Sequence, residues 1–149
     1  MADSTQPIPV ILCGKTMEVG ETVTSLIKPE IEVIQFIQSF EDAKVNFASL
    51  LAGDGPTSKI SNDLGSHDFT RPPRGIIFGR AFDPEDVKEL NRLFRDATSQ
   101  PVAWIAGHPA VRAPPIPTPG YAEKAADNVK RALQKWMNDG ADSRDIVYY

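Results

Sequence analysis

Cysteine and histidine are scarce in this sequence. Its 149 residues include one cysteine, Cys13, and two histidines, His67 and His108. A single thiol cannot form an intrachain disulfide, and such chains are typical of a reducing compartment such as the cytoplasm. Three such side chains spread along the sequence also provide no cluster for a structural zinc ion. The sequence therefore predicts a cytoplasmic protein without a metal centre.

Long apolar runs and an excess of basic charge are also lacking. No run approaches the roughly 18–20 apolar residues that cross a bilayer. Residues 1–8 carry an acid but not the basic segment of a secretory signal. The formal net charge is -4 and the pI is about 5.1, whereas proteins that bind nucleic acids or anionic membrane surfaces are usually basic. We therefore expect no nucleic acid and no membrane among the partners.

What the sequence does contain is a strand–helix unit that recurs four times. Residues 1–8 are polar and include a proline, so we expect a flexible arm there, followed by a single domain at 9–149. Short apolar runs predict buried strands at 10–13, 31–37, 75–82 and 101–106. Apolar residues at helical spacing predict helices at 18–27, 40–51, 84–97 and 121–138.

This alternation favours a parallel sheet with helices on both faces. We predict a three-layer α/β/α sandwich around a mainly parallel four-stranded sheet in the order 2-1-3-4, of the Rossmann-like or flavodoxin-like type. Residues 145–149 are apolar enough to add a fifth strand at an edge. The segment 54–74 is longer than an ordinary connection, and we expect either a functional loop or a mobile insertion. Ligands of such sheets bind where the strand order reverses, beyond the first and third strands.

The first strand leads into a turn at Gly14 and a helix that contains Gly20. This resembles the start of a dinucleotide-binding Rossmann domain, but the inner glycines of G-x-G-x-x-G are absent. A P-loop is excluded because Pro9 takes the place of its first glycine. Two interpretations stay open. Gly14, Lys15 and Thr16 bind an anion at the helix N-terminus, or the glycines serve packing alone.

Other polar residues follow the second and third strands, at the edge of the sheet where the turn lies. Ser39 follows the second strand, and Arg80 and Asp83 follow the third. We include all three as ligand-binding residues, with Arg80 placed to hold an anionic group. Ser39 and Asp83 are also typical N-caps, because their side-chain oxygens accept hydrogen bonds from the first turn of a helix.

Cys13 and His108 are the candidates for catalysis. Cys13 ends the first strand, where Lys15 or the helix dipole would activate the thiol by lowering its pKa. His108 follows the fourth strand at the same edge and is the candidate general acid/base. The alternative for Cys13 is a buried, inert side chain.

These patterns predict a small ligand-binding or protein-interaction module that lacks an intact dinucleotide fingerprint. The alternative is an enzyme that acts on a small anionic metabolite, a phosphate or a carboxylate, in the crevice beyond the first and third strands. The sequence names no cofactor. Bulky residues gather near the C-terminus, among them Trp136, Tyr148 and Tyr149. They either complete the core or form the surface of a homodimer.

Overall fold

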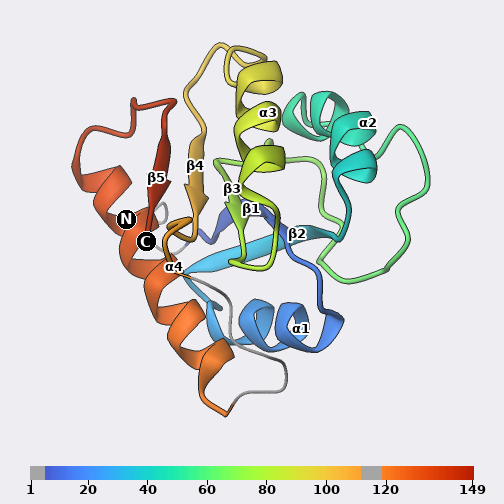
Figure 1. Ribbon diagram of the computed structural model, residues 1–149. Coiled ribbons are helices and arrows are strands. Elements are labelled where there is room, and N and C mark those ends of the chain that lie inside the picture. The colour runs from blue at the N-terminus through green and yellow to red at the C-terminus, as the bar shows by residue number, and fades with distance from the viewer. Residues whose placement is uncertain (1–5, 112–118) are drawn as a thin grey trace.

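The computed structural model describes residues 6–111 and 119–149, and strands and helices alternate along it (Figure 1). Most of the predicted arm lies outside the described residues, and the first strand already begins at Ile8. The elements are β1 (Ile8–Cys13), α1 (Met17–Leu26), β2 (Ile31–Ile37), α2 (Phe40–Leu51), β3 (Gly75–Phe78), α3 (Pro84–Phe94), β4 (Ala103–Ala106), α4 (Tyr121–Asn138) and β5 (Ile146–Tyr148).

The five strands form one sheet in the order β2-β1-β3-β4-β5, and every neighbouring pair is parallel. Helices α1 and α4 cover one face and helices α2 and α3 cover the other (Figure 1). This confirms the predicted three-layer sandwich and the order 2-1-3-4, and the tail supplies the fifth strand. The third strand is shorter than predicted because Phe82 N–H closes a turn onto Gly79 O at 3.1 Å.

Two of the helices begin at side chains that the sequence marked as caps. Ser39 Oγ accepts a hydrogen bond from the N–H of Asp42 at 3.1 Å, ahead of α2. The Asp83 carboxylate accepts one from the N–H of Glu85 at 2.9 Å, ahead of α3, and Pro84 takes the first helical position. Each cap satisfies a backbone donor that the helix leaves unpaired.

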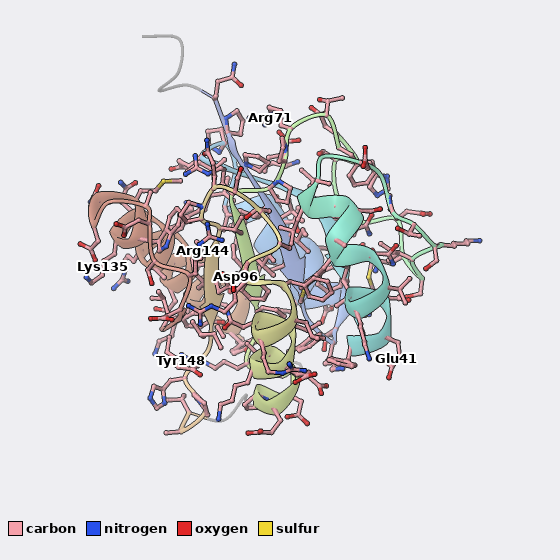
Figure 2. All side chains as sticks on the ribbon, turned by 90° about the horizontal axis from the view of Figure 1, so that it is seen from above. Glu41, Arg71, Asp96, Lys135, Arg144 and Tyr148 are labelled. Atoms are coloured by element: carbon pink, nitrogen blue, oxygen red, sulfur yellow. The ribbon has the colours of Figure 1, made fainter. Side chains whose placement is uncertain are left out.

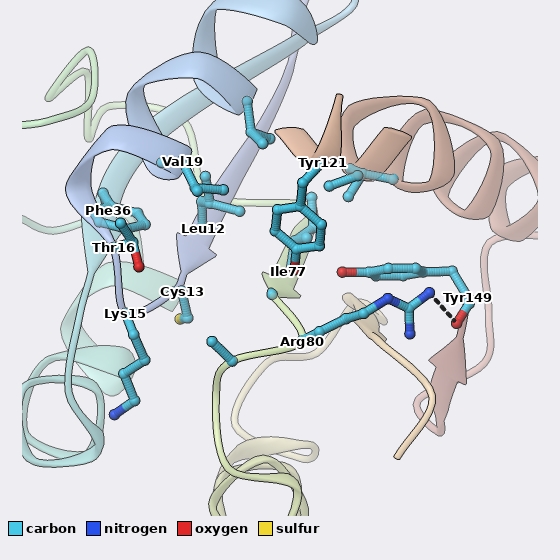
Figure 3. A pocket seen from close by; sticks show the side chains of 17 residues that line it. Leu12, Cys13, Lys15, Thr16, Val19, Phe36, Ile77, Arg80, Tyr121 and Tyr149 are labelled. Carbon is cyan, nitrogen blue, oxygen red and sulfur yellow. Dashed lines mark hydrogen bonds between the residues drawn. The ribbon is translucent and has the colours of Figure 1, made fainter. Parts of the chain in front are cut away.

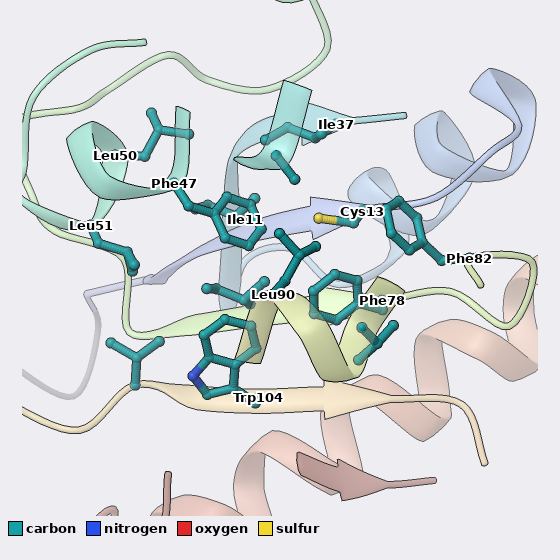
Figure 4. Packing of buried hydrophobic residues seen from close by; sticks show 14 of the residues in the cluster. Ile11, Cys13, Ile37, Phe47, Leu50, Leu51, Phe78, Phe82, Leu90 and Trp104 are labelled. Atoms are coloured by element: carbon teal, nitrogen blue, oxygen red, sulfur yellow. The ribbon is translucent and has the colours of Figure 1, made fainter. Parts of the chain in front are cut away.

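A hydrophobic core lies on each face of the sheet. Beneath α2 and α3 the core is aromatic and contains Phe47, Phe78 and Trp104 (Figure 4). The Phe47 ring lies 5.6 Å from Phe94 and 6.2 Å from Trp104, measured between ring centroids. Beneath α1 and α4 it is mostly aliphatic and includes Val23 and Val129. Side chains of β1 alternate between the two cores, which explains its continuous apolar run.

The long segment 54–74 lies along the outer edge of β2. Three backbone hydrogen bonds of 2.9–3.0 Å join them: Phe36 N–H to Leu64 O, Ser66 N–H to Val33 O, and His67 N–H to Ile34 O. The pairing of β1 with β2 shifts beyond Val10, which faces Val33, because Ile11 faces Gln35 and Ile34 is skipped. The segment therefore protects an edge that would otherwise offer unpaired backbone groups to another chain.

Candidate functional site

A cavity opens at the C-terminal ends of β1 and β3, where the strand order reverses, between α1 and α4 (Figure 3). Its volume is about 80 Å³. Most of the wall is apolar and includes Leu12, Val19, Val23, Phe36, Ile77 and Val129. Five residues predicted from the sequence also line it, namely Cys13, Gly14, Lys15, Thr16 and Arg80.

The two glycines of the first turn and helix make room for a phenylalanine. A Cβ on Gly20 would lie 2.6 Å from Phe36 Cζ, and a Cβ on Gly14 would lie 3.3 Å from Phe36 Cε1. Phe36 is 1% exposed, so its ring has little freedom to move aside. The ring therefore fills the space against the glycine turn and forms one wall of the cavity.

Two tyrosines that were not predicted as site residues form another part of the wall. Tyr121 is the first residue of α4, and Tyr149 follows β5. The Tyr149 hydroxyl donates a hydrogen bond to Phe78 O at 3.3 Å. One signal could have found both tyrosines. In a parallel sheet, helices start and strands end at the same edge, so a residue in either position lies at the edge where the cavity opens.

Burial raises the pKa values of both tyrosines. The pKa of Tyr149 rises to about 12, because burial is reinforced by the neighbouring Tyr121 and only partly offset by Arg80. The pKa of Tyr121 is also raised by burial, while the charge and the backbone of Arg80 lower it. Both phenols therefore keep their protons near neutral pH and act as hydrogen-bonding groups.

The guanidinium of Arg80 is held beneath the ring of Tyr149. Its Cζ lies 4.7 Å from the ring centroid, and Nη2 donates to Tyr149 O at 3.3 Å (Figure 3). A Cβ on Gly107 would lie 2.5 Å from Arg80 Cγ and 3.1 Å from Nη1, so the absence of a side chain there lets the arginine pass. Nη1 is buried without a hydrogen-bond partner among the described residues. The charge thus lies between Tyr149 and the end of β4.

Lys15 and Thr16 line the cavity differently. The side chain of Lys15 points away from the tyrosines, and its Nζ lies 4.6 Å from the ring centroid of Phe82 (Figure 3). Phe82 belongs to the core on the other face of the sheet. Thr16 is the N-cap residue of α1, but its side chain makes no capping hydrogen bond. Its hydroxyl and the first-turn N–H groups of α1 are therefore the donors at this part of the rim.

Cys13 lies at the end of β1 with its side chain in the aromatic core, between Ile11 and Phe82 in Figure 4. It is 0% exposed. Burial raises the pKa of the thiol far above its ordinary value, and the nearby Lys15 offsets only part of that effect. The thiolate needed for nucleophilic chemistry is therefore disfavoured, and the geometry favours the interpretation of Cys13 as a buried, inert side chain.

We expect Cys13 to make stability fall at alkaline pH. Its thiol stays neutral in the folded state but ionises above pH 9.0 once the chain unfolds. The thiol therefore leaves the free energy of unfolding unchanged below pH 9.0. Above this pH, its ionisation in the unfolded chain lowers the free energy of unfolding, by about 1.4 kcal/mol near pH 10. Urea denaturation at about pH 8 and pH 10 measures the loss. Cys13→Ala should lack this part of the decline, and an equal decline in both proteins would contradict the assignment.

The remaining predicted residues do not line the cavity. His108 is exposed, and its Nδ1 accepts a hydrogen bond from Ala110 N–H at 3.1 Å. Ser39 and Asp83 act as the helix caps described above. Catalysis by His108 and Cys13 stays a prediction, and of these two residues only Cys13 lines the cavity.

Residues 6–111 and 119–149 contain no group of three or more histidine, cysteine, aspartate or glutamate side chains that could hold a metal ion. Within the same residues, no helix is both long and apolar enough to cross a membrane.

The C-terminal aromatic residues divide between core, cavity and surface. Trp136 is buried and its Nε1 donates to Ser143 O at 2.9 Å. Tyr149 lines the cavity, whereas Tyr148 is 38% exposed and lies at the periphery of the molecule (Figure 2). Of the three, only Tyr148 thus offers a surface to a partner, and a homodimer through this region stays a prediction.

No family model and no solved structure matches this chain. A curated protein of Aspergillus oryzae (strain ATCC 42149 / RIB 40), "Kojic acid related protein 6", is 31% identical to it over 143 residues. The match spans 95% of this chain and 86% of that protein. Identity at this level over nearly the whole of both chains is a property of the domain rather than of a short motif. The chain therefore belongs to the same family as Kojic acid related protein 6.

Proposed function

We propose that this protein is a ligand-binding module that takes a small, mainly apolar ring compound into the cavity between α1 and α4. The observation that carries the proposal is the cavity itself, with apolar and aromatic walls at the point of strand reversal. Small-molecule sites are typically concave, largely apolar and equipped with a few polar groups. Phe36, Tyr121 and Tyr149 provide flat surfaces on which a ring can pack.

The size of the cavity supports a single ring rather than a nucleotide cofactor. A volume of about 80 Å³ suits a compact group rather than a nucleotide. The Phe36 ring occupies the space against Gly14 and Gly20. This is the glycine turn at which a dinucleotide-binding domain would approach its pyrophosphate.

Binding is favoured over turnover because of the titratable groups in the described part of the wall. These are Cys13, Lys15, Arg80, Tyr121 and Tyr149. A general acid or base works best with a pKa near the operating pH. Burial instead raises the pKa values of the thiol and of both phenols. The name of the Aspergillus relative mentions kojic acid, which makes that compound a suitable first probe.

Filling the cavity should abolish binding without unfolding the protein. Ala125 lines the cavity from α4 and is half-buried, so Ala125→Phe places a ring inside it. Kojic acid and benzyl alcohol serve as probes, and thermal denaturation measures the stabilisation. A probe at about 100 times its dissociation constant adds about 2.7 kcal/mol to the free energy of unfolding. We expect this gain in the unmodified protein and its loss in Ala125→Phe.

Ala48→Phe is the matched control, because Ala48 is exposed on α2, on the other face of the sheet. Its binding should equal that of the unmodified protein. Amide NMR signals of Gly14, Gly20 and Gly79, which line the cavity, locate the bound probe. Binding that persists in Ala125→Phe, or that leaves these three signals unmoved, would place the ligand elsewhere. If neither probe binds, a protein-interaction module, which the sequence predicted alongside a ligand-binding module, would be favoured.

The cytoplasmic location stays a prediction from the single thiol.

A further inference from the structure

We propose that the cavity selects uncharged ring compounds that carry a carbonyl-type oxygen, and discriminates against both carboxylates and amidines of the same shape. This inference rests on the proposed function, since it names the class of ligand for that same cavity. It differs from the anionic ligand predicted from the sequence, because the structure places the two candidate cations differently from what their sequence positions imply.

The first step concerns the walls. An ion that enters a mostly apolar cavity loses hydration, and this cost is recovered only where an opposite charge faces it. The same cost acts on two side chains of the wall, because burial raises the pKa values of Tyr121 and Tyr149 and keeps both neutral. A charged ligand would need a partner of opposite charge in the wall.

The second step is that each cation of the wall already has an aromatic partner in this chain. The Arg80 guanidinium lies beneath the Tyr149 ring, donates to Tyr149 O, and turns Nη1 toward Gly107. The Lys15 ammonium lies over Phe82, which belongs to the core on the other face of the sheet.

An acidic side chain, Asp86, also lies near Lys15. The pKa of Asp86 is raised by burial and by Asp83, is lowered by Lys15, and is raised again by Glu41. The lysine charge therefore interacts with Asp86 in the first turn of α3. Asp86 lies outside the cavity, so a cationic ligand finds no carboxylate side chain in the described part of the wall.

The third step concerns the hydrogen-bond donors that remain. The first turn of α1 has no side-chain cap, since Thr16 makes no capping hydrogen bond, and Thr16 and Val19 both line the cavity. Its N–H groups attract the partial negative charge of an oxygen. Glu18, exposed in the same turn, opposes a full negative charge there. Tyr121 keeps its O–H and adds a donor. A carbonyl oxygen satisfies these groups.

Three isosteric probes separate the possibilities, namely benzamide, benzoate and benzamidine, which are neutral, negative and positive near neutral pH. NMR titration of the unmodified protein, followed at the amides of Gly14, Gly20 and Gly79, gives the three dissociation constants. We expect benzamide to bind about tenfold more tightly than either ion.

A matched pair of variants tests the role of the oxygen. Tyr121→Phe should weaken benzamide binding about three- to tenfold and leave toluene, which has no oxygen, unchanged. Tyr148→Phe makes the same chemical change at an exposed position outside the cavity and should alter neither affinity. Equal weakening of toluene would mean that Tyr121 serves shape alone, and the proposed hydrogen bond would be wrong.

The outcomes distinguish this inference from the proposed function. Tightest binding by benzoate or benzamidine, or equal binding by all three probes at the cavity, would overturn the selectivity and leave the ligand-binding function standing. If neither the three probes nor toluene binds at the cavity, the proposed function itself fails. Tighter binding of benzamide than of either ion, together with weaker benzamide binding in Tyr121→Phe, supports both the selectivity and the ligand-binding function.

Discussion

Gly65→Ala is expected to lower the free energy of unfolding by about 2–4 kcal/mol. Gly65 has a φ of +127°, which an L-residue rarely adopts, and a Cβ there would lie 2.5 Å from the carbonyl oxygen of Ile34. That oxygen belongs to β2 and already accepts the N–H of His67 at 3.0 Å. The backbone therefore cannot move to accommodate the new Cβ without separating the 54–74 segment from the edge of β2.

Urea denaturation measures this loss, and hydrogen exchange locates it. The amides of Phe36, Ser66 and His67 donate the hydrogen bonds that join the segment to β2, so they should exchange faster in the variant. Gly55→Ala is the matched control in the same segment, because a Cβ at Gly55 would meet the Phe69 ring at an ordinary 3.6 Å. Its stability should change by no more than about 0.5 kcal/mol. Equal effects at Gly55 and Gly65 would show that the Ile34 contact is not the cause.

Gly20→Ala should also destabilise the protein, although alanine in a helix is ordinarily about 1 kcal/mol better than glycine. The new Cβ would lie within 3.0 Å of three ring atoms of Phe36, and the ring is buried. Overpacking of this kind costs about 1–3 kcal/mol, and at 2.6 Å we expect the upper part of that range. The net loss in the free energy of unfolding is then about 1–2 kcal/mol, measurable by urea denaturation.

A double variant identifies the cause. Gly20→Ala combined with Phe36→Leu replaces the ring by a shorter side chain, so the pair should be more stable than the sum of the two single effects predicts. Gly79→Ala tests the same substitution where a Cβ would lie 3.7 Å from the nearest atom, Cys13 O, and should have little effect. Strict additivity of the two changes would mean that Gly20 and Phe36 do not compete for the same space.

These two glycines illustrate different limits of prediction from sequence. Gly20 stands in a strand–turn–helix pattern that resembles a nucleotide-binding start, and its packing role was one of the two open interpretations. The structure favours that interpretation, because Phe36 comes from the next strand and its ring fills the space at Gly20. Nothing in the pattern around Gly65 predicts that it faces the carbonyl of Ile34. Ile34 is also the residue that β2 skips in its pairing with β1.

The wall of the cavity shows the same division. Gly14 and Thr16 were predicted because they are local to the first turn, and the structure places both at the cavity. Tyr121 and Tyr149 were missed, since each reaches the cavity from an element far along the chain. Their positions at the start of a helix and the end of a strand contained the signal, but that signal becomes useful only when the parallel order of all five strands is known.

The sequence by itself determined the strand–helix alternation, the parallel three-layer fold and the caps at Ser39 and Asp83. These follow from hydrophobic periodicity and from hydrogen bonds between residues that are close in the chain. Only the tertiary structure decided where the charges of Lys15 and Arg80 point, because long side chains settle against partners from distant elements, here Phe82 and Tyr149. That placement is the reason why we propose a neutral ligand where the sequence predicted an anionic one, since both charges already lie against aromatic rings of this chain.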